Sequence, residues 1–324
     1  PDQKIPMLPS SLAEDLCSLK AGQLRPAISI LVNIGRSYEI NDFEITPSLI
    51  KVAQQLTYYD VNLIADDNDD IIALRKIAEK FRLERLSAGA IQITLPDIHI
   101  WIGDDGEITV SRINRESPGR MLVSEIMIMA NWLMAKFLAE HNVPAIFRSQ
   151  ASPRERLYKG NNGTLFQNCM QRKLLSRFIL NPEPEKHSGL GLDAYVTATS
   201  PIRKYFDLVT QRQIRAVFGL EKHSTREEIN DVIQFLEQPM SHVIKMQYSR
   251  NRYWLLKFLE KRIGQKEEAI ILNKKRRSHQ ILIKEYMIEC DIPLSNGIDL
   301  KPEDLIQITI QHVNARKDKL SVFM

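Results

Sequence analysis

Alternating apolar and polar positions near the start of the chain predict an antiparallel β-ribbon. Ile28, Ile30, Val32 and Ile34 occupy every second position, which is the spacing of side chains on one face of a strand. The segment from Tyr38 to Ile45 is expected to be the hairpin partner of this strand. The ribbon should therefore bury one of its two faces.

Three segments with helical spacing are expected in the first half of the chain. Thr46 and Pro47 have the side chains of an N-cap and a first helical position, which predicts a helix from Pro47 to about Ile64. A second helix is expected over residues 70–86 and a third over residues 120–141. The third helix is apolar on nearly every side, which is typical of a helix in the centre of a fold.

Short β-like runs separate the second and third helices. Ala90–Leu95 and Ile98–Ile102 predict a strand pair. A turn over residues 104–106 then leads into another strand that ends near Ile113. Helices and antiparallel strands are thus expected side by side in this part of the chain.

The last third of the chain changes from helical to β-like patterning. Thr225 or Ser224 caps a helix to about Gln238, and a second helix follows over residues 240–263. Beyond Glu268 come five short β-like runs: 269–272, 280–285, 287–291, 305–313 and 319–323. About sixty residues of this kind predict a five-stranded OB β-barrel.

These patterns predict an α+β fold with two domains. Residues 1–263 should form a mixed or antiparallel sheet with helices around a central buried helix, and residues 264–324 the OB-fold barrel. The content of 44% hydrophobic and 26% charged residues is that of an ordinary globular protein.

The charge distribution is uneven although the net charge is only +4. Residues 245–284 contain 12 Lys or Arg against 3 acids, whereas residues 60–107 contain 11 acids against 5 bases. The basic segment fits either a polyanionic partner or a solvated helix face.

Three cysteines far apart in the sequence argue against a disulfide framework or a zinc site, and they favour a cytoplasmic location. The most apolar run, residues 121–139, is interrupted by polar side chains and predicts a buried helix rather than a membrane span. No signal peptide opens the sequence given, and we expect a monomer without membrane contact.

The stretch from Tyr195 to Phe218 predicts a helix that begins at an anion-binding site. Ser200 has the side chain of an N-cap and Pro201 fits the first helical position. Arg203 would then stand in the first turn, where the helix dipole disfavours a cation. Either a bound phosphate compensates this charge, or Arg203 pairs with Asp207 one turn later.

The segment Thr199–Arg212, with its Thr-Ser-Pro-Ile-Arg-Lys-Tyr start, resembles the signature of the ribonuclease II (RNB) family. The resemblance implies a processive 3′→5′ exoribonuclease that uses Mg²⁺ to hydrolyse single-stranded RNA to nucleoside 5′-monophosphates. It also implies that Arg203 contacts the phosphate at the catalytic centre. Thr199, Ser200, Lys204 and Arg212 belong to the same motif and are predicted to bind RNA.

The opening Pro-Met-Leu-Pro and Cys-Ser-Leu of residues 6–19 resemble a segment in the middle of the family's catalytic domain. The resemblance implies that the aspartates that bind Mg²⁺ lie upstream, so we expect no metal ligand in this chain. The aspartates in residues 65–70 offer a substitute, but they fit a solvated loop and helix cap better.

Two further side chains are candidates for contact with the terminal ribose. The resemblance implies this role for Tyr58 and for Glu125, which is the one acid between Arg120 and Glu140. Tyr58 could instead pack at the edge of the core. Glu125 could instead pair with Arg120 or Arg203, since a lone buried carboxylate is costly. Where family members place a stacking phenylalanine, this chain has Ile93.

The basic run in the predicted barrel is the last candidate RNA contact. Lys274, Lys275, Arg276 and Arg277 could bind phosphates through salt-sensitive interactions, or form an exposed turn without a partner. The sequence thus predicts an exoribonuclease of the ribonuclease II type that is inactive as an isolated chain. The alternative is a non-catalytic or truncated RNA-binding module.

Overall fold

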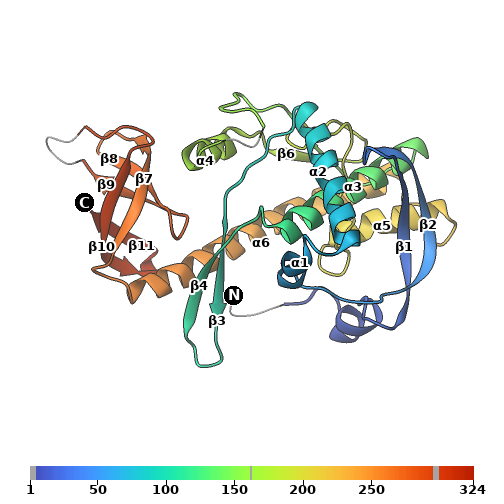
Figure 1. Cartoon of the computed structure of the whole chain (residues 1–324), viewed down its shortest axis with the longest axis horizontal. Helices are drawn as coiled ribbons and strands as arrows, with labels where there is room; N and C mark the ends of the chain where they lie inside the picture. Colours follow the sequence, from blue (N-terminus) through green and yellow to red (C-terminus); the bar gives the residue numbers. More distant parts are fainter. Residues whose placement is uncertain (1–4, 161–162, 295–298) are drawn as a thin grey trace.

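The computed structural model describes residues 5–160, 163–294 and 299–324. It shows a helical part and a small β-barrel at opposite ends, connected by one long helix, α6 (Figure 1). The helices are α1 Tyr58–Ile64, α2 Asp69–Ser87, α3 Pro118–Glu140, α4 Leu165–Leu174, α5 Tyr205–Val217 and α6 Arg226–Glu260, with a π-helical turn at Ser11–Leu16 and a 3-10 turn at Ala315–Lys317. The strands are β1 Leu24–Ile34, β2 Ile40–Lys51, β3 Asp97–Ile102, β4 Ile108–Ile113, β5 Phe147–Gln150, β6 Phe178–Asn181, β7 Lys266–Lys274, β8 Ser278–Ile283, β9 Ile288–Pro293, β10 Leu305–Asn314 and β11 Lys319–Phe323.

Helix α3 is the central helix of the helical part, as its sequence predicts. Ser117 stands at the N-cap in extended conformation and Pro118 occupies the first turn. Leu133 and Leu138 are completely enclosed and belong to two different clusters of buried side chains. By length and composition α3 could cross a membrane, but 56% of its most apolar window is buried within the protein. Burial on several sides is typical of a core helix.

The predicted helix from Pro47 to Ile64 is wrong over most of its length. Strand β2 continues to Lys51 and pairs antiparallel with β1, where Pro47 lies opposite Ile28. A two-stranded ribbon tolerates proline because outward N–H groups need no partner strand. Helix α1 begins only after Thr57, whose hydroxyl accepts from the N–H of Asp60 at 3.2 Å while the Asp60 carboxylate accepts from the N–H of Thr57 at 2.8 Å. This capping box marks the true helix start.

The predicted strand at Ala90–Leu95 is also absent from the described structure. The N–H of Ile91 donates to the carbonyl of Gly189 at 3.0 Å, and the N–H of Thr94 donates to Oδ1 of Asn168 at 2.8 Å. A loop and a side chain therefore satisfy this backbone in place of a second strand. The hairpin partner of β3 is instead β4, beyond the predicted turn at residues 104–106.

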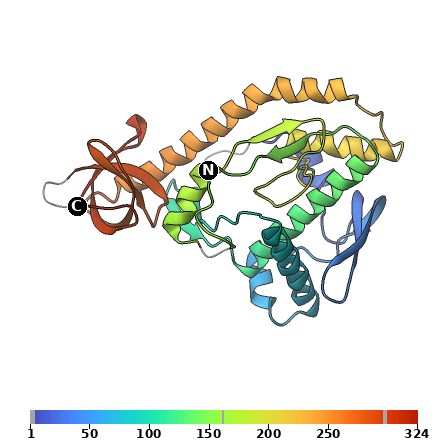
Figure 2. The same ribbon diagram turned by 90° about the horizontal axis from the view of Figure 1, so that it is seen from above.

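One helix, α6, replaces the two predicted helices after residue 224. Thr225 caps it in a capping box with Glu228, as expected. Pro239 lies inside α6, and Phe235, whose carbonyl loses its partner, is 78% exposed. Water can hydrate that carbonyl, so the helix continues past the proline. Figure 2 shows α6 changing direction along its length.

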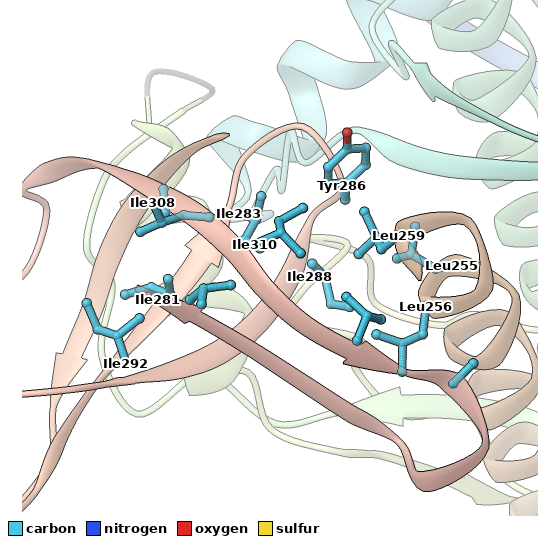
Figure 3. Close-up of a cluster of buried hydrophobic side chains, with 14 of the residues drawn as sticks. Leu255, Leu256, Leu259, Ile281, Ile283, Tyr286, Ile288, Ile292, Ile308 and Ile310 are labelled. Atoms are coloured by element: carbon cyan, nitrogen blue, oxygen red, sulfur yellow. The ribbon is translucent and has the colours of Figure 1, made fainter. Parts of the chain in front are cut away.

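The five C-terminal strands form a nearly closed antiparallel barrel in the order β11-β10-β7-β8-β9. Its core contains fully buried isoleucines such as Ile281, Ile283 and Ile308. Leu256 and Leu259 of α6 pack into the same cluster (Figure 3). Helix α6 therefore anchors the barrel to the rest of the chain. The division between residues 263 and 264 stays a prediction.

Candidate functional site

The predicted helix start at Pro201 is wrong, because α5 begins at Tyr205. Residues 200–203 form a turn in which the N–H groups of Arg203 and Lys204 donate to the Ser200 carbonyl at 3.2 and 3.0 Å. Proline suits the second position of such a turn. Ser200 does not act as the N-cap: its own N–H donates to Oδ2 of Asp207 at 3.0 Å. A carboxylate inside the helix thus holds the turn that precedes it.

Arg203 is exposed and points its guanidinium at the turn rather than at Asp207. Its Nη2 donates to the Ser200 hydroxyl at 3.1 Å. The predicted alternative pairing with Asp207 is wrong, because that carboxylate is 1% exposed and turned toward the Ser200 N–H. Arg203 has no carboxylate partner in the described part of the chain. A guanidinium and a hydroxyl ahead of a helix N-terminus are groups that can bind a phosphate together.

The segment before this turn is fixed to α3 by Asn131. Its Oδ1 accepts from the N–H of Ala198 at 2.9 Å, and its Nδ2 donates to the Tyr195 hydroxyl at 3.2 Å and to Thr199 Oγ1 at 3.5 Å. Gln211 of α5 donates to the Ala198 carbonyl at 2.7 Å. The sequence analysis does not identify Asn131 or Gln211 as residues that hold this segment. A lone asparagine in an apolar helix is nevertheless a signal of buried hydrogen bonding.

Glu125 forms a structural ion pair, but with Arg82 and Arg85 of α2 and not with Arg120 or Arg203, the partners named in the alternative. Arg82 Nε lies 2.9 Å from Oε1, and Arg85 Nη2 lies 2.8 Å from Oε1 and 2.6 Å from Oε2. Arg85 Nε adds a contact of 3.2 Å to Oε2. These donors use the four lone-pair sites of the carboxylate. A ribose hydroxyl would therefore have to displace an arginine, and the ribose contact of Glu125 stays a prediction.

Tyr58 stands at the start of α1, beside the first turns of α3. Its side chain is 41% exposed, and the Arg120 guanidinium lies 4.3 Å from the ring centroid. The N–H of Gly119 donates to Oδ1 of Asn62 at 2.9 Å, which holds α1 against α3. The exposed ring is available to a ligand. Ile93, by contrast, packs beside a small buried cluster.

The remaining predicted RNA contacts are spread over the molecule. Lys204 is exposed beside Arg203, whereas Arg212 forms an ion pair of 2.6 Å with Glu221. In the barrel, the ammonium groups of Lys274 and Lys275 pair with aspartates, and Arg276 and Arg277 are exposed. The barrel and α5 lie at different ends of the molecule (Figure 1). A single RNA would have to extend from α5 to the barrel to contact both the motif residues and the basic residues of the barrel.

His187 lies behind the motif segment in a closed environment. It is 5% exposed, its Nδ1 has no described partner, and its ring packs edge-on against Tyr195 with centroids 5.6 Å apart. Burial, with the charge of Arg148, lowers the pKa of His187 to about 4. The imidazole is therefore neutral in the fold near neutral pH.

The depressed pKa of His187 predicts an acid-sensitive contribution to stability. Unfolded chains bind this proton near pH 6.5, so the contribution is present above pH 6.5 and is lost as the pH falls toward the folded pKa of about 4. Between pH 7.5 and 4.5 the unfolding free energy, measured with urea, should fall by about 2 kcal/mol more in the wild type than in His187→Gln. The exposed His223→Gln should behave like the wild type. Equal losses in all three proteins would contradict this assignment.

The described residues do not fit a magnesium site. They contain no group of three Asp, Glu, His or Cys side chains able to hold a metal ion. In residues 65–70, Asn68 caps α2 and Asp66 pairs with Arg75 at 2.7 Å. Near the motif, Asp207 has one buried oxygen without a described partner, and Glu125 is saturated by arginines. One oxygen is too few for a cation that prefers six ligands.

Comparisons with known proteins place this geometry in a family. The RNB domain model matches residues 1–219. An uncharacterized ribonuclease of Synechocystis sp. is 30% identical over 332 residues, covering 99% of this chain and 49% of that protein. The chain therefore spans about half the length of this curated relative; others include proteins named exoribonuclease 2 and ribonuclease R.

Solved structures agree on the fold. Apo ribonuclease R of Mycoplasma genitalium superposes with a TM-score of 0.82 at 16% identity, covering 98% of this chain and 60% of that one. The yeast pseudonuclease Ssd1 gives 0.62 at 17% identity, covering 89% of this chain and 41% of that one. The predicted resemblance is confirmed: the chain belongs to the RNB-domain family and is homologous to ribonuclease II and ribonuclease R exoribonucleases.

Proposed function

We propose that this chain is part of a 3′→5′ exoribonuclease that degrades single-stranded RNA processively to nucleoside 5′-monophosphates. The observation that carries the proposal is the exposed Arg203 guanidinium, which has no carboxylate partner in the described structure and shares a turn with the Ser200 hydroxyl. Such a group can stabilise negative charge that develops on a phosphate during hydrolysis. Ribonuclease R of Mycoplasma genitalium, which has this fold, has been solved with single-stranded RNA.

The side chains of this region have separate proposed roles. Arg203 holds the phosphate at the scissile bond, with Ser200, Thr199 and Lys204 beside it. Tyr58 contacts the terminal ribose through its exposed ring. Asn131 and Asp207 position the turn through the hydrogen bonds to Ala198 and Ser200. The barrel, with Arg276 and Arg277 at its β7–β8 turn, guides the RNA by electrostatic contacts.

Magnesium dependence is part of the proposal, but its ligands would lie outside this sequence. Aspartate carboxylates would be its ligands. A bound Mg²⁺ would neutralise charge on the phosphate and activate the attacking water. We further propose that residues 1–263 and 264–324 are separate domains of a cytoplasmic monomer. Burial raises the pKa of the Cys169 and Cys290 thiols, which is consistent with structural rather than reactive cysteines.

A non-catalytic RNA-binding module is the second candidate function. The lack of a metal-binding group in the described residues favours it for the isolated chain. The fold is also that of the yeast pseudonuclease Ssd1. The two candidates make different predictions for the longer protein of which this chain would be a part, which we call the parental protein.

Nuclease assays distinguish the two candidates. The 324-residue chain and the parental protein, each with Mg²⁺, are incubated with 5′-labelled single-stranded RNA. We expect the parental protein to shorten the RNA from its 3′ end. The chain alone should release no nucleotides, because its described residues contain no group that could hold Mg²⁺. Hydrolysis by the chain alone would contradict the placement of the metal ligands. Binding without hydrolysis by the parental protein would support the binding module.

A further inference from the structure

Arg148, like Arg203, has no counter-ion among the described residues, but unlike Arg203 it is partly buried. Its guanidinium makes no hydrogen bond or ion pair with any described residue, and its Nε is buried without a partner. Arg82 and Arg85, by contrast, both pair with Glu125. Burial lowers the pKa of Arg148, because desolvation disfavours the charged form of the guanidinium. A cation kept there without a partner is a candidate for binding an anionic ligand.

The guanidinium is nevertheless held in a defined position. It stacks on the Phe178 ring, with its central carbon 3.8 Å from the ring centroid. Phe178 is 45% exposed and Arg148 is half-buried, so this contact lies at the boundary between the core and the surface. This stacking offsets part of the free-energy cost of burying the guanidinium charge, and it covers one face of the planar group. The edge of the guanidinium keeps its N–H donors, whose fork geometry matches a phosphate.

Strand β5 places Arg148 beside the motif segment. Its N–H donates to the Tyr195 carbonyl at 2.8 Å, four residues before Thr199. Burial is the main cause that raises the pKa of the Tyr195 phenol. The charges of Arg148, Asp207 and Arg85 have smaller effects on the same pKa. Asp207 in turn holds the Ser200 N–H. Tyr195 is therefore the residue that connects Arg148, through its carbonyl, with Asp207, which holds the Arg203 turn.

We propose that Arg148 binds a backbone phosphate of single-stranded RNA, as a second anion contact beside the one proposed for Arg203. This inference rests on the proposed function, since it assumes that RNA enters this region. It adds a residue from β5 to a site otherwise built from α1, α3, α5 and the segment between residues 195 and 204. No aspartate or glutamate among the described residues competes for the guanidinium.

The test is equilibrium binding of 5′-fluorescein oligoadenylate to the whole chain at several salt concentrations, without Mg²⁺. Arg148→Gln should weaken binding about tenfold or more. It should also lower the dependence of log affinity on log salt by about 0.7, the value for one phosphate contact on a single strand. Arg148→Lys should keep the salt slope and lose part of the affinity, because a point charge replaces the fork.

Arg36 offers the matched control, because it is an exposed arginine in the β1–β2 turn with no described partner. Arg36→Gln changes the net charge equally and should bind like the wild type. Thermal unfolding distinguishes a role in RNA binding from a role in stability. If Arg148 has no structural role, removal of its uncompensated charge should leave the Tm of Arg148→Gln unchanged or higher. Unchanged affinity and slope in Arg148→Gln, or a lowered Tm that accounts for the lost binding, would overturn the inference alone. Failure of the wild type to bind would overturn the proposed function as well.

Discussion

Arg203→Ala in the parental protein is expected to lower kcat for nucleotide release by about 100-fold or more, which is the loss typical of removing one donor to developing charge. RNA affinity should change by less than about tenfold, because many phosphate contacts share the binding energy. The physical basis is that Arg203 is exposed and makes its described side-chain hydrogen bond only to Ser200. Single-turnover release from 3′-labelled RNA at saturating protein separates kcat from affinity.

Two variants control this experiment. Arg203→Lys keeps a charge without the planar fork and should be intermediate. Arg215→Ala removes an arginine from the other end of α5, about 15 Å along the helix from its first residue, where its Nη1 pairs with Glu221 at 2.6 Å. Its kcat should equal that of the wild type. Equal losses in kcat and affinity for Arg203→Ala would argue against a role in the chemical step.

Glu125→Gln is expected to destabilise the chain by about 3 kcal/mol, because it leaves two arginines without their shared counter-ion. Glu125 is 3% exposed, and the side chains of Arg82 and Arg85 are 15% and 9% exposed. Arg82 keeps a contact of 2.6 Å with Glu116, and Arg85 one of 3.0 Å with the Leu190 carbonyl. The loss should therefore lie at the low end for a buried ion pair. Urea unfolding at neutral pH measures it.

Glu116→Gln is the matched control for this prediction. It removes the other acid bound to Arg82, but from a side chain that is 35% exposed. Its effect should be below about 1 kcal/mol, as for exposed ion pairs. Similar losses in both variants would show that burial does not set the strength of this network. A selective loss of RNA over DNA discrimination in Glu125→Gln would instead support its predicted ribose contact.

The parts of the fold that sequence predicts best have long and regular patterns. Helix α3 is apolar over six turns, and the five barrel strands are separated by polar turns, so each pattern has one dominant interpretation. The errors occur where one residue type fits two structures. Thr46 and Pro47 fit a helix start as well as a strand edge, and Pro239 reads as a helix break although a solvated helix tolerates it. Tertiary packing decides such cases.

The candidate site was predictable only in its local part. The contiguous motif identifies Arg203, but it does not show that α5 begins only at Tyr205 or that the Ser200 N–H donates to Asp207 seven residues on. The partners of Glu125 lie 40 and 43 residues away. The contact residues of Arg148 and Asn131 are also far away in the sequence. Arg148 stacks on Phe178, and Asn131 bonds to Ala198 and Thr199. Single-sequence spacing contains no information on such contacts.

Photo-crosslinking tests the central claim most directly. Single-stranded RNA with a thiouridine at its 3′ end is bound to the chain, irradiated, and the attached peptide identified by mass spectrometry. If the turn around Arg203 holds the scissile phosphate next to the 3′ nucleotide, crosslinks should fall within residues 195–205 and beside Tyr58. Crosslinks confined to the barrel, with none in the helical part, would contradict the account.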